Sequence, residues 1–251
     1  MKKLLLIIVL FVIQTQAQNP IIPGHADPHM RVFDGKMYIS VGKDKSPDNE
    51  KFYIVNWSVF SSDDLVNWEL ETVIDPKDTH LGKGYEYCWA TDITTRNGKY
   101  YLYASENYHA TSVFVSDKPN GPYRDVLGKS LIPESLSENH EYDPSILIDD
   151  DGSQYIVFGR DGQVGKNLFH YQIAKLNEDM ISYQEPKDLL TDGEFGFGEK
   201  NRARDHQYIH KYNGIYYLSC AGAYRTSLNP YGPYENERHS GQNGHSSFSE
   251  F

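Results

Sequence analysis

The chain has little cysteine, few basic residues and only one long apolar run, and each shortage excludes a class of protein. Two Cys among 251 residues are too few for a disulfide-built scaffold. Cys88 and Cys220 either pair or remain buried thiols. With 24 Lys and Arg against 35 Asp and Glu, the net charge of −11 excludes long-range attraction to nucleic acid or to an anionic membrane.

The one long apolar run lies at the start of the chain. Lys2 and Lys3 precede residues 4–13, and Ala17 follows a short polar stretch. A basic start, a short apolar core and a small residue before a break are typical of a secretory signal peptide. The run is too short to span a bilayer as a helix, and no other segment is expected to do so. We therefore expect cleavage after Ala17, a secreted or periplasmic protein, and a single domain over residues 18–251.

Aromatic residues are abundant, at 14%, and they occur in a repeated pattern. An Asp, a short apolar stretch, a Gly turn and an aromatic stretch recur four times, and all four turns end in Asp-Gly or Asn-Gly. Such turns between alternating apolar runs indicate β-hairpins. The four turn glycines are Gly35, Gly98, Gly152 and Gly214.

Each hairpin is followed by a third apolar stretch, a polar turn and an outer strand. Four strands per repeat, without helix-length periodic segments, predict an all-β fold, a β-propeller. Residues 244–251 match the first strand of a fifth unit, and the chain stops before its Gly turn. We therefore expect a five-bladed propeller whose last blade is incomplete, as in a C-terminally truncated chain.

Four aspartates, one in each repeat, open the inner strands, and a propeller directs such positions to one central pocket. Carboxyl groups that share a pocket repel one another, so their pKa values separate and provide a general acid and a general base. The alternative is that these residues cap turns, which is the interpretation for Asp149, Asp150 and Asp151. The four are Asp27, Asp92, Asp143 and Asp205.

Several motifs together resemble glycoside hydrolase family 43. They are residues 19–28 with His25-Ala26-Asp27-Pro28, residues 89–92 and 98–103, residues 142–145 and 149–152, residues 211–218, and the Gly-Pro-Tyr steps at Gly121 and Gly232. The resemblance implies a secreted, inverting glycosidase with a five-bladed propeller. Its substrates would be α-L-arabinofuranosides, β-D-xylosides and related plant or algal oligo- or polysaccharides.

The resemblance also implies roles for individual residues. Asp27 matches the general base, and Asp143 matches the residue that orients the acid and raises its pKa. The acid departs from the family pattern, because Asp205 stands where the family usually has Glu, six residues before Lys211. Glu199 is the second choice of acid. His206 is the third, as in related enzymes that act on anhydrogalactose-containing fragments and use a His.

The remaining site predictions concern substrate and metal. Trp89 is predicted to be a subsite residue, and Asp92, His25 and His206 are further substrate-binding candidates. His245 matches a family histidine beside an axial cation, often calcium, although it also fits a structural role. No cofactor is expected to be required. A catalytically impaired propeller that binds glycans, and a scaffold for protein partners, are the alternatives to an enzyme.

Overall fold

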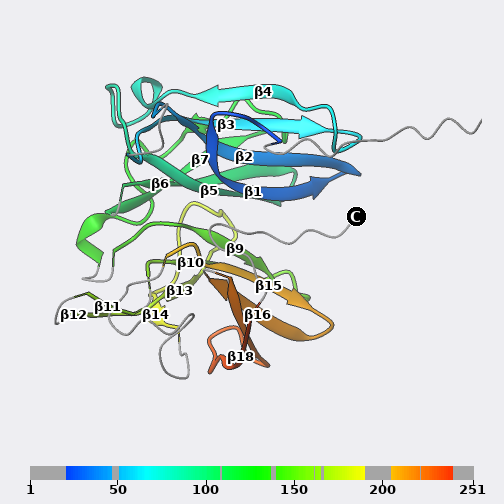
Figure 1. Ribbon diagram of the computed structural model, residues 1–251, viewed down its shortest axis with the longest axis vertical. Helices are drawn as coiled ribbons and strands as arrows, with labels where there is room; N and C mark the ends of the chain where they lie inside the picture. The colour runs from blue at the N-terminus through cyan, green and yellow to red at the C-terminus, as the bar shows by residue number, and fades with distance from the viewer. Residues whose placement is uncertain are drawn as a thin grey trace, which may run out of the picture.

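The computed structural model describes residues 21–46, 51–107, 109–136, 140–160, 162–164, 167–189, 205–220 and 222–239, and these residues form an all-β propeller. They make four four-stranded antiparallel sheets, arranged as blades around a common centre (Figure 1). Within the described part, the only helices are two 3₁₀ turns, Pro76–Asp78 and Glu134–Leu136, so no helix there is long and apolar enough to cross a bilayer.

The first two blades each use four consecutive strands. Blade 1 comprises β1 (His25–Phe33), β2 (Lys36–Asp44), β3 (Ile54–Ser62) and β4 (Glu69–Ile74). Blade 2 comprises β5 (Cys88–Arg96), β6 (Lys99–Glu106), β7 (Ala110–Ser116) and β8 (Arg124–Asp125).

The other two blades follow the same order, with one interruption. Blade 3 comprises β9 (Ser145–Ile148), β10 (Gln154–Phe158), β13 (Gln172–Lys175) and β14 (Lys187–Asp188), and the hairpin of β11 (Gly162–Val164) and β12 (Asn167–Phe169) lies between β10 and β13 in the chain. Blade 4 comprises β15 (Tyr208–Tyr212), β16 (Ile215–Cys220), β17 (Ala223–Ser227) and β18 (Glu235–His239). The predicted beginning of a fifth blade, residues 244–251, lies outside the described residues, as does the predicted signal peptide.

The hairpin glycines have the geometry that the sequence pattern requires. Gly35, Gly98, Gly152 and Gly214 all have positive φ, between 74° and 79°. Asp34, Asn97 and Asn213, which precede three of them, are also left-handed, as a type I′ turn demands. In both Gly-Pro-Tyr steps the tyrosine hydroxyl donates to the carbonyl four residues earlier, Tyr123 to Pro119 and Tyr234 to Pro230. The repeats are therefore equivalent in structure as well as in sequence.

Apolar residues fill the spaces between neighbouring blades. One cluster, with Trp57, Phe114 and Leu102, lies between blades 1 and 2, and another, with Tyr171, Leu218 and Tyr234, lies between blades 3 and 4. Cys88 and Cys220, left open by the sequence, are both buried free thiols in different clusters.

The structure corrects one expectation about the repeats, that the four aspartates occupy equivalent positions. Asp27 and Asp143 are equivalent, since each lies two residues before the first regularly paired residue of its inner strand, His29 and Ser145. In blade 4 that position belongs to His206, ahead of the pair between Tyr208 and Ser219. Asp205 comes one residue earlier. A bulge between Cys88 and Thr91 changes the count in blade 2, where Asp92 is a paired residue of β5.

Candidate active site

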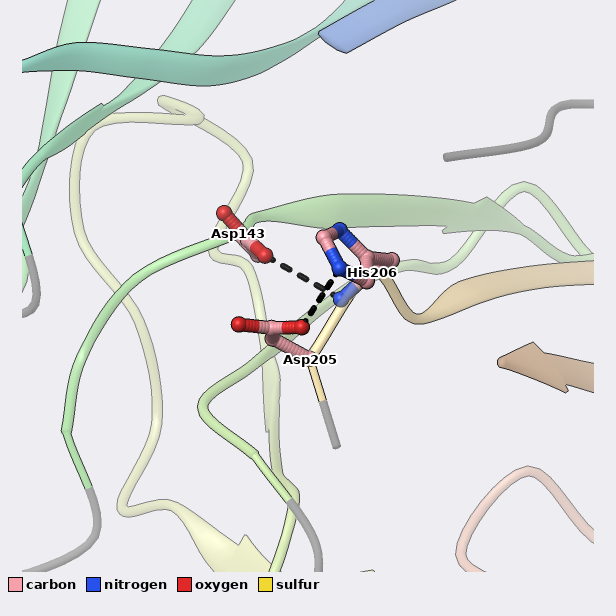
Figure 2. A group of neighbouring side chains, drawn as sticks. All are labelled: Asp143, Asp205 and His206. Atoms are coloured by element: carbon pink, nitrogen blue, oxygen red, sulfur yellow. Dashed lines mark hydrogen bonds and ion pairs between the residues drawn. The ribbon is translucent and has the colours of Figure 1, made fainter. Parts of the chain in front are cut away.

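Asp143, Asp205 and His206 meet where the inner strands of blades 3 and 4 begin. The side chains point toward one another, Asp143 from the segment before β9 and the other two from the segment before β15 (Figure 2). His206 Nε2 lies 2.6 Å from Asp205 Oδ1. The backbone N–H of His206 donates to Asp143 Oδ2 at 3.1 Å. These three residues therefore form a single hydrogen-bonded group, hereafter the acidic group.

Two further side chains hold the acidic group in place. The Tyr142 hydroxyl donates to Asp205 Oδ2 at 3.1 Å. The Ser105 hydroxyl, at the end of β6, accepts the N–H of Asp143 at 2.8 Å and lies 3.5 Å from Asp143 Oδ1. Neither residue is among the predicted site residues. Tyr142 adjoins Asp143 in the chain and was open to inference, whereas Ser105 carries no local signal.

Asp27 belongs to the same electrostatic environment. It lies at the start of β1, inside the bulge between Ala26 and His29. Burial raises the pKa of Asp27 to about 6; the positive charge of His206 opposes this shift, and the negative charge of Asp205 adds to it. The base candidate from blade 1 thus interacts with the acidic group from blades 3 and 4.

The ion pair determines where protons reside in the acidic group. Burial alone would raise the pKa of Asp205, but the bonds from His206 and Tyr142 hold it below its usual value. Burial alone would lower the pKa of His206, but the contact with Asp205 outweighs this and raises it to about 9. Burial, followed by the charge of Asp205, raises the pKa of Asp143. At neutral pH the group therefore holds an imidazolium between carboxyl groups.

Asp27, Asp143 and His206 share an unusual backbone conformation. Their φ angles are 54°, 54° and 67°, in the left-handed region that residues other than Gly seldom adopt. Non-glycine residues in this region are enriched at functional sites, where the surrounding structure compensates the strain. The three equivalent positions of blades 1, 3 and 4 therefore turn the chain in the same way at the site.

Trp89 also lies close to the acidic group. Its ring contacts the ring of Tyr142, with centroids 6.2 Å apart in an edge-to-face arrangement. Its indole N–H donates to the carbonyl of Phe52 at 3.1 Å. The predicted subsite residue is thus adjacent to the tyrosine that binds Asp205.

Two other predicted substrate-binding residues lie elsewhere. Asp92 is fully buried, and its carboxylate accepts from the Arg31 guanidinium and from the N–H groups of Ile93 and Ile146. These bonds connect Asp92 of blade 2 to blades 1 and 3, and its role in substrate binding stays a prediction. His25 packs edge-to-face on Phe60, with centroids 5.0 Å apart, and its Nδ1 lies 3.1 Å from the Pro23 carbonyl.

Glu199 and His245, the alternative acid and the predicted metal residue, lie outside the described residues. Among the residues that are described, the acidic group alone brings three ligand atoms close enough to hold a metal. Calcium prefers oxygen ligands, whereas this group offers a protonated imidazole already paired with a carboxylate. The acidic group therefore does not fit calcium, and the axial cation expected beside His245 stays a prediction.

A partly buried carboxyl from blade 1, near an imidazolium that lies between two carboxyl groups of blades 3 and 4, is suited to general acid–base chemistry. The fold is a β-propeller, and the acidic group with Asp27 is its candidate site for hydrolysis. The chain belongs to glycosyl hydrolases family 43, whose model matches residues 17–244. It is a glycosidase that hydrolyses O-glycosyl bonds.

Individual relatives support this assignment. The chain is 30% identical to a xylosidase/arabinosidase of Bacteroides ovatus, over 85% of this chain and 78% of that protein. It is also 30% identical to xylosidase/arabinosidase 43A of Humicola insolens, over 83% and 77% of the two chains. A solved β-xylosidase/α-arabinofuranosidase from a compost microbial metagenome, in complex with xylotriose and in a calcium-free form, has a TM-score of 0.71 at 28% identity, covering 90% of this chain and 82% of that one.

Proposed function

We propose that the protein is an inverting α-L-arabinofuranosidase or β-D-xylosidase that removes pentose units from plant or algal polysaccharides. The 2.6 Å ion pair between Asp205 and His206 is the observation that carries the proposal, because it holds a proton at the site where the family pattern has its acid. The relatives, which are named for xylosidase and arabinosidase activity, support the substrate class.

In the proposed reaction, Asp27 takes a proton from a water molecule as the water oxygen attacks the anomeric carbon. The bond from that carbon to the leaving oxygen breaks, and the leaving oxygen receives the proton held by the Asp205–His206 pair. One displacement from the face opposite the leaving group inverts the anomeric configuration. Asp143 orients the pair through the His206 N–H.

In the proposed reaction the general acid is a pair of residues, not a single one. Asp205 alone is a poor proton donor, since both of its oxygens accept bonds, from His206 and from Tyr142. His206 carries the proton, and Asp205 fixes its ring. The first and third choices of acid from the sequence thus act together.

Substrates with different leaving groups test these roles. Aryl arabinofuranosides and xylosides with acidic phenols depart without a proton, whereas sugar leaving groups need one. We expect Asp205→Asn and His206→Gln to lose at least about 100-fold in kcat/KM on xylo-oligosaccharides but much less on the activated aryl glycosides. Asp27→Asn should lose activity on both, because the base is needed for every substrate.

Product stereochemistry completes the test. Proton NMR during hydrolysis should show the inverted anomer first. Retention of configuration would contradict the one-step mechanism, and full activity of His206→Gln on xylo-oligosaccharides would remove His206 from the acid. Binding of xylan without release of sugar would instead support the glycan-binding alternative.

Two architectural expectations remain part of the proposal. We propose a fifth blade beginning in residues 244–251, which the family assignment favours. The described blades leave a cavity of about 670 Å³ between blades 1, 3 and 4, lined by residues such as Arg31, Tyr208 and Tyr224, and this unfilled space supports a further blade. We also propose secretion after cleavage at Ala17, which N-terminal sequencing of the exported protein would test.

A further inference from the structure

A row of aromatic rings leads away from the acidic group across the junction of blades 1 and 2. The rings of Trp89 and Tyr87 are 6.0 Å apart, and those of Tyr87 and Tyr53 are 6.2 Å apart, both edge-to-face. Phe52, next to Tyr53, has 76% of its surface exposed. We call Trp89, Tyr87, Tyr53 and Phe52 the aromatic strip.

Hydrogen bonds and an ion pair connect the two backbone segments that carry the strip. The N–H of Ile54 donates to the Glu86 carbonyl at 3.0 Å, so the segment before β3 is bonded to the segment before β5. Lys45 Nζ lies 2.6 Å from Glu86 Oε1, and the Trp89 indole bonds the Phe52 carbonyl. These bonds fix the two segments relative to each other, so the strip is ordered before a ligand arrives.

Solvent exposure distinguishes the strip from a core cluster, although Trp89 also packs against the buried cluster between blades 1 and 2. Tyr53, Tyr87 and Trp89 are only partly buried, whereas the aromatic rings between the blades, such as Trp57 and Phe114, are fully buried. An exposed run of aromatic rings on a braced surface presents apolar faces and edges that water solvates poorly. Pyranose rings have apolar C–H faces that pack against such aromatic side chains.

The position of the strip relative to the acid indicates which side of the scissile bond its ligand lies on. Trp89 contacts Tyr142, and Tyr142 donates to Asp205, so a single residue separates the start of the strip from the acid. The acid contacts the leaving oxygen of the substrate. A chain that follows the strip is therefore attached to the leaving oxygen and is released with it.

We propose that the aromatic strip binds the pyranose chain on the leaving-group side of the scissile bond, so that Phe52 and Tyr53 are specificity-determining residues for longer substrates. This inference rests on the proposed function for its direction. It predicts that the enzyme favours polymeric or oligomeric substrates over aryl glycosides, which reach only the beginning of the strip.

Substrates of different length test the strip. We expect Phe52→Ala and Tyr53→Ala to raise KM for xylotetraose to xylohexaose about five- to tenfold, with kcat nearly unchanged. KM for an aryl xyloside should not change. Tyr212→Ala is the matched control, because Tyr212 is 49% exposed at the Gly214 hairpin of blade 4, away from the strip, and it should alter neither substrate.

Binding measured by calorimetry separates this inference from the proposed function. Weaker xylohexaose binding in Phe52→Ala, with binding retained in Tyr212→Ala, supports the strip even if the wild type hydrolyses nothing. Equal KM changes on long and short substrates, or unchanged xylohexaose binding in both strip variants, would overturn it. Tyr53→Phe keeps the ring and should behave as the wild type.

Discussion

At the scale of single residues, the site depends on burial and on neighbouring charges, which together shift the pKa values of its carboxyl and imidazole groups. The same burial that favours the neutral form of Asp27 and Asp143 would also favour neutral His206, yet the nearby carboxylates reverse the outcome for the imidazole. The pKa of Asp27 therefore lies below that of His206, which is the order that acid–base catalysis by this pair requires.

This order of pKa values predicts a bell-shaped pH profile. Asp27 must be ionised to accept a proton, so kcat/KM should fall as the pH drops below about 6. His206 must be protonated, so kcat/KM should fall again as the pH rises above about 9. Measurements on a xylo-oligosaccharide from pH 4 to 10 check both limbs.

The expected loss of activity above about pH 9 can be tested separately by titrating His206. A ring signal present in the NMR spectrum of the wild type and missing from that of His206→Gln should titrate near pH 9, because it belongs to the imidazole paired with Asp205. A midpoint near the ordinary histidine value would show that the ion pair does not hold the proton, and the acid assignment would then be wrong.

At the scale of elements, bulges in the inner strands position the site. Asp27 and Trp89 both lie inside bulges, at Ala26/His29 of β1 and at Cys88/Thr91 of β5. A bulge redirects side chains that regular pairing would place on alternate faces. Gly42 of β2, which pairs with Ala26, lets the two bulged strands approach, because a Cβ there would lie 2.8 Å from the Cys88 carbonyl.

Replacement of Gly42 by Ala tests this close approach. The added Cβ would lie 2.3 Å from Ile54 Cγ2 as well as meeting the Cys88 backbone, so blades 1 and 2 must move apart. We expect the free energy of unfolding to fall by about 1–3 kcal/mol, measured by urea denaturation. Gly84→Ala is the control, since its nearest neighbour would be Lys77 Cε at 4.0 Å and the change should be within about 0.5 kcal/mol. Equal unfolding midpoints for the two variants would contradict the packing argument.

These bulges also explain which parts of the site could be predicted from sequence. Period-two apolar stretches and Gly turns carry a strong local signal, and the four sheets followed from them. A bulge adds a residue without any hydrophobic signature, so Asp92 was aligned with Asp27 although it belongs to the paired part of β5. Counting back from the turns does not separate the two candidates in blade 4, because Asp27 precedes Gly35 by eight residues, as His206 precedes Gly214, whereas Asp143 precedes Gly152 by nine, as Asp205 precedes Gly214. The Asp205–His206 ion pair depends on side-chain rotamers and could not be read from the sequence.

At the scale of the whole molecule, Arg31 connects blades around the axis. It extends from β1, binds Asp92 of β5 through two bonds of 2.9 and 2.6 Å, and donates to the Ile146 carbonyl of β9 at 2.7 Å. Its guanidinium also lies 5.5 Å from the ring centre of Tyr208 of β15. One largely buried cation of β1, with 15% of its side chain exposed, thus contacts the inner strands of the other three described blades. The acidic group needs these strands in register, because its members come from different blades.

Removal of one partner of this buried pair should therefore destabilise the whole propeller. Asp92→Asn leaves the largely buried Arg31 charge without its counter-ion, and we expect a loss of about 3 kcal/mol in the free energy of unfolding. The double variant Arg31→Met/Asp92→Leu removes both charges and should recover much of that loss in urea denaturation. Lys99→Ala breaks an exposed pair with Asp117, so it should cost less than about 1 kcal/mol. If Asp92→Asn unfolded at the same urea concentration as Lys99→Ala, the axial pair would be no more than another surface contact, and the register of the blades would have to be maintained by the apolar clusters alone.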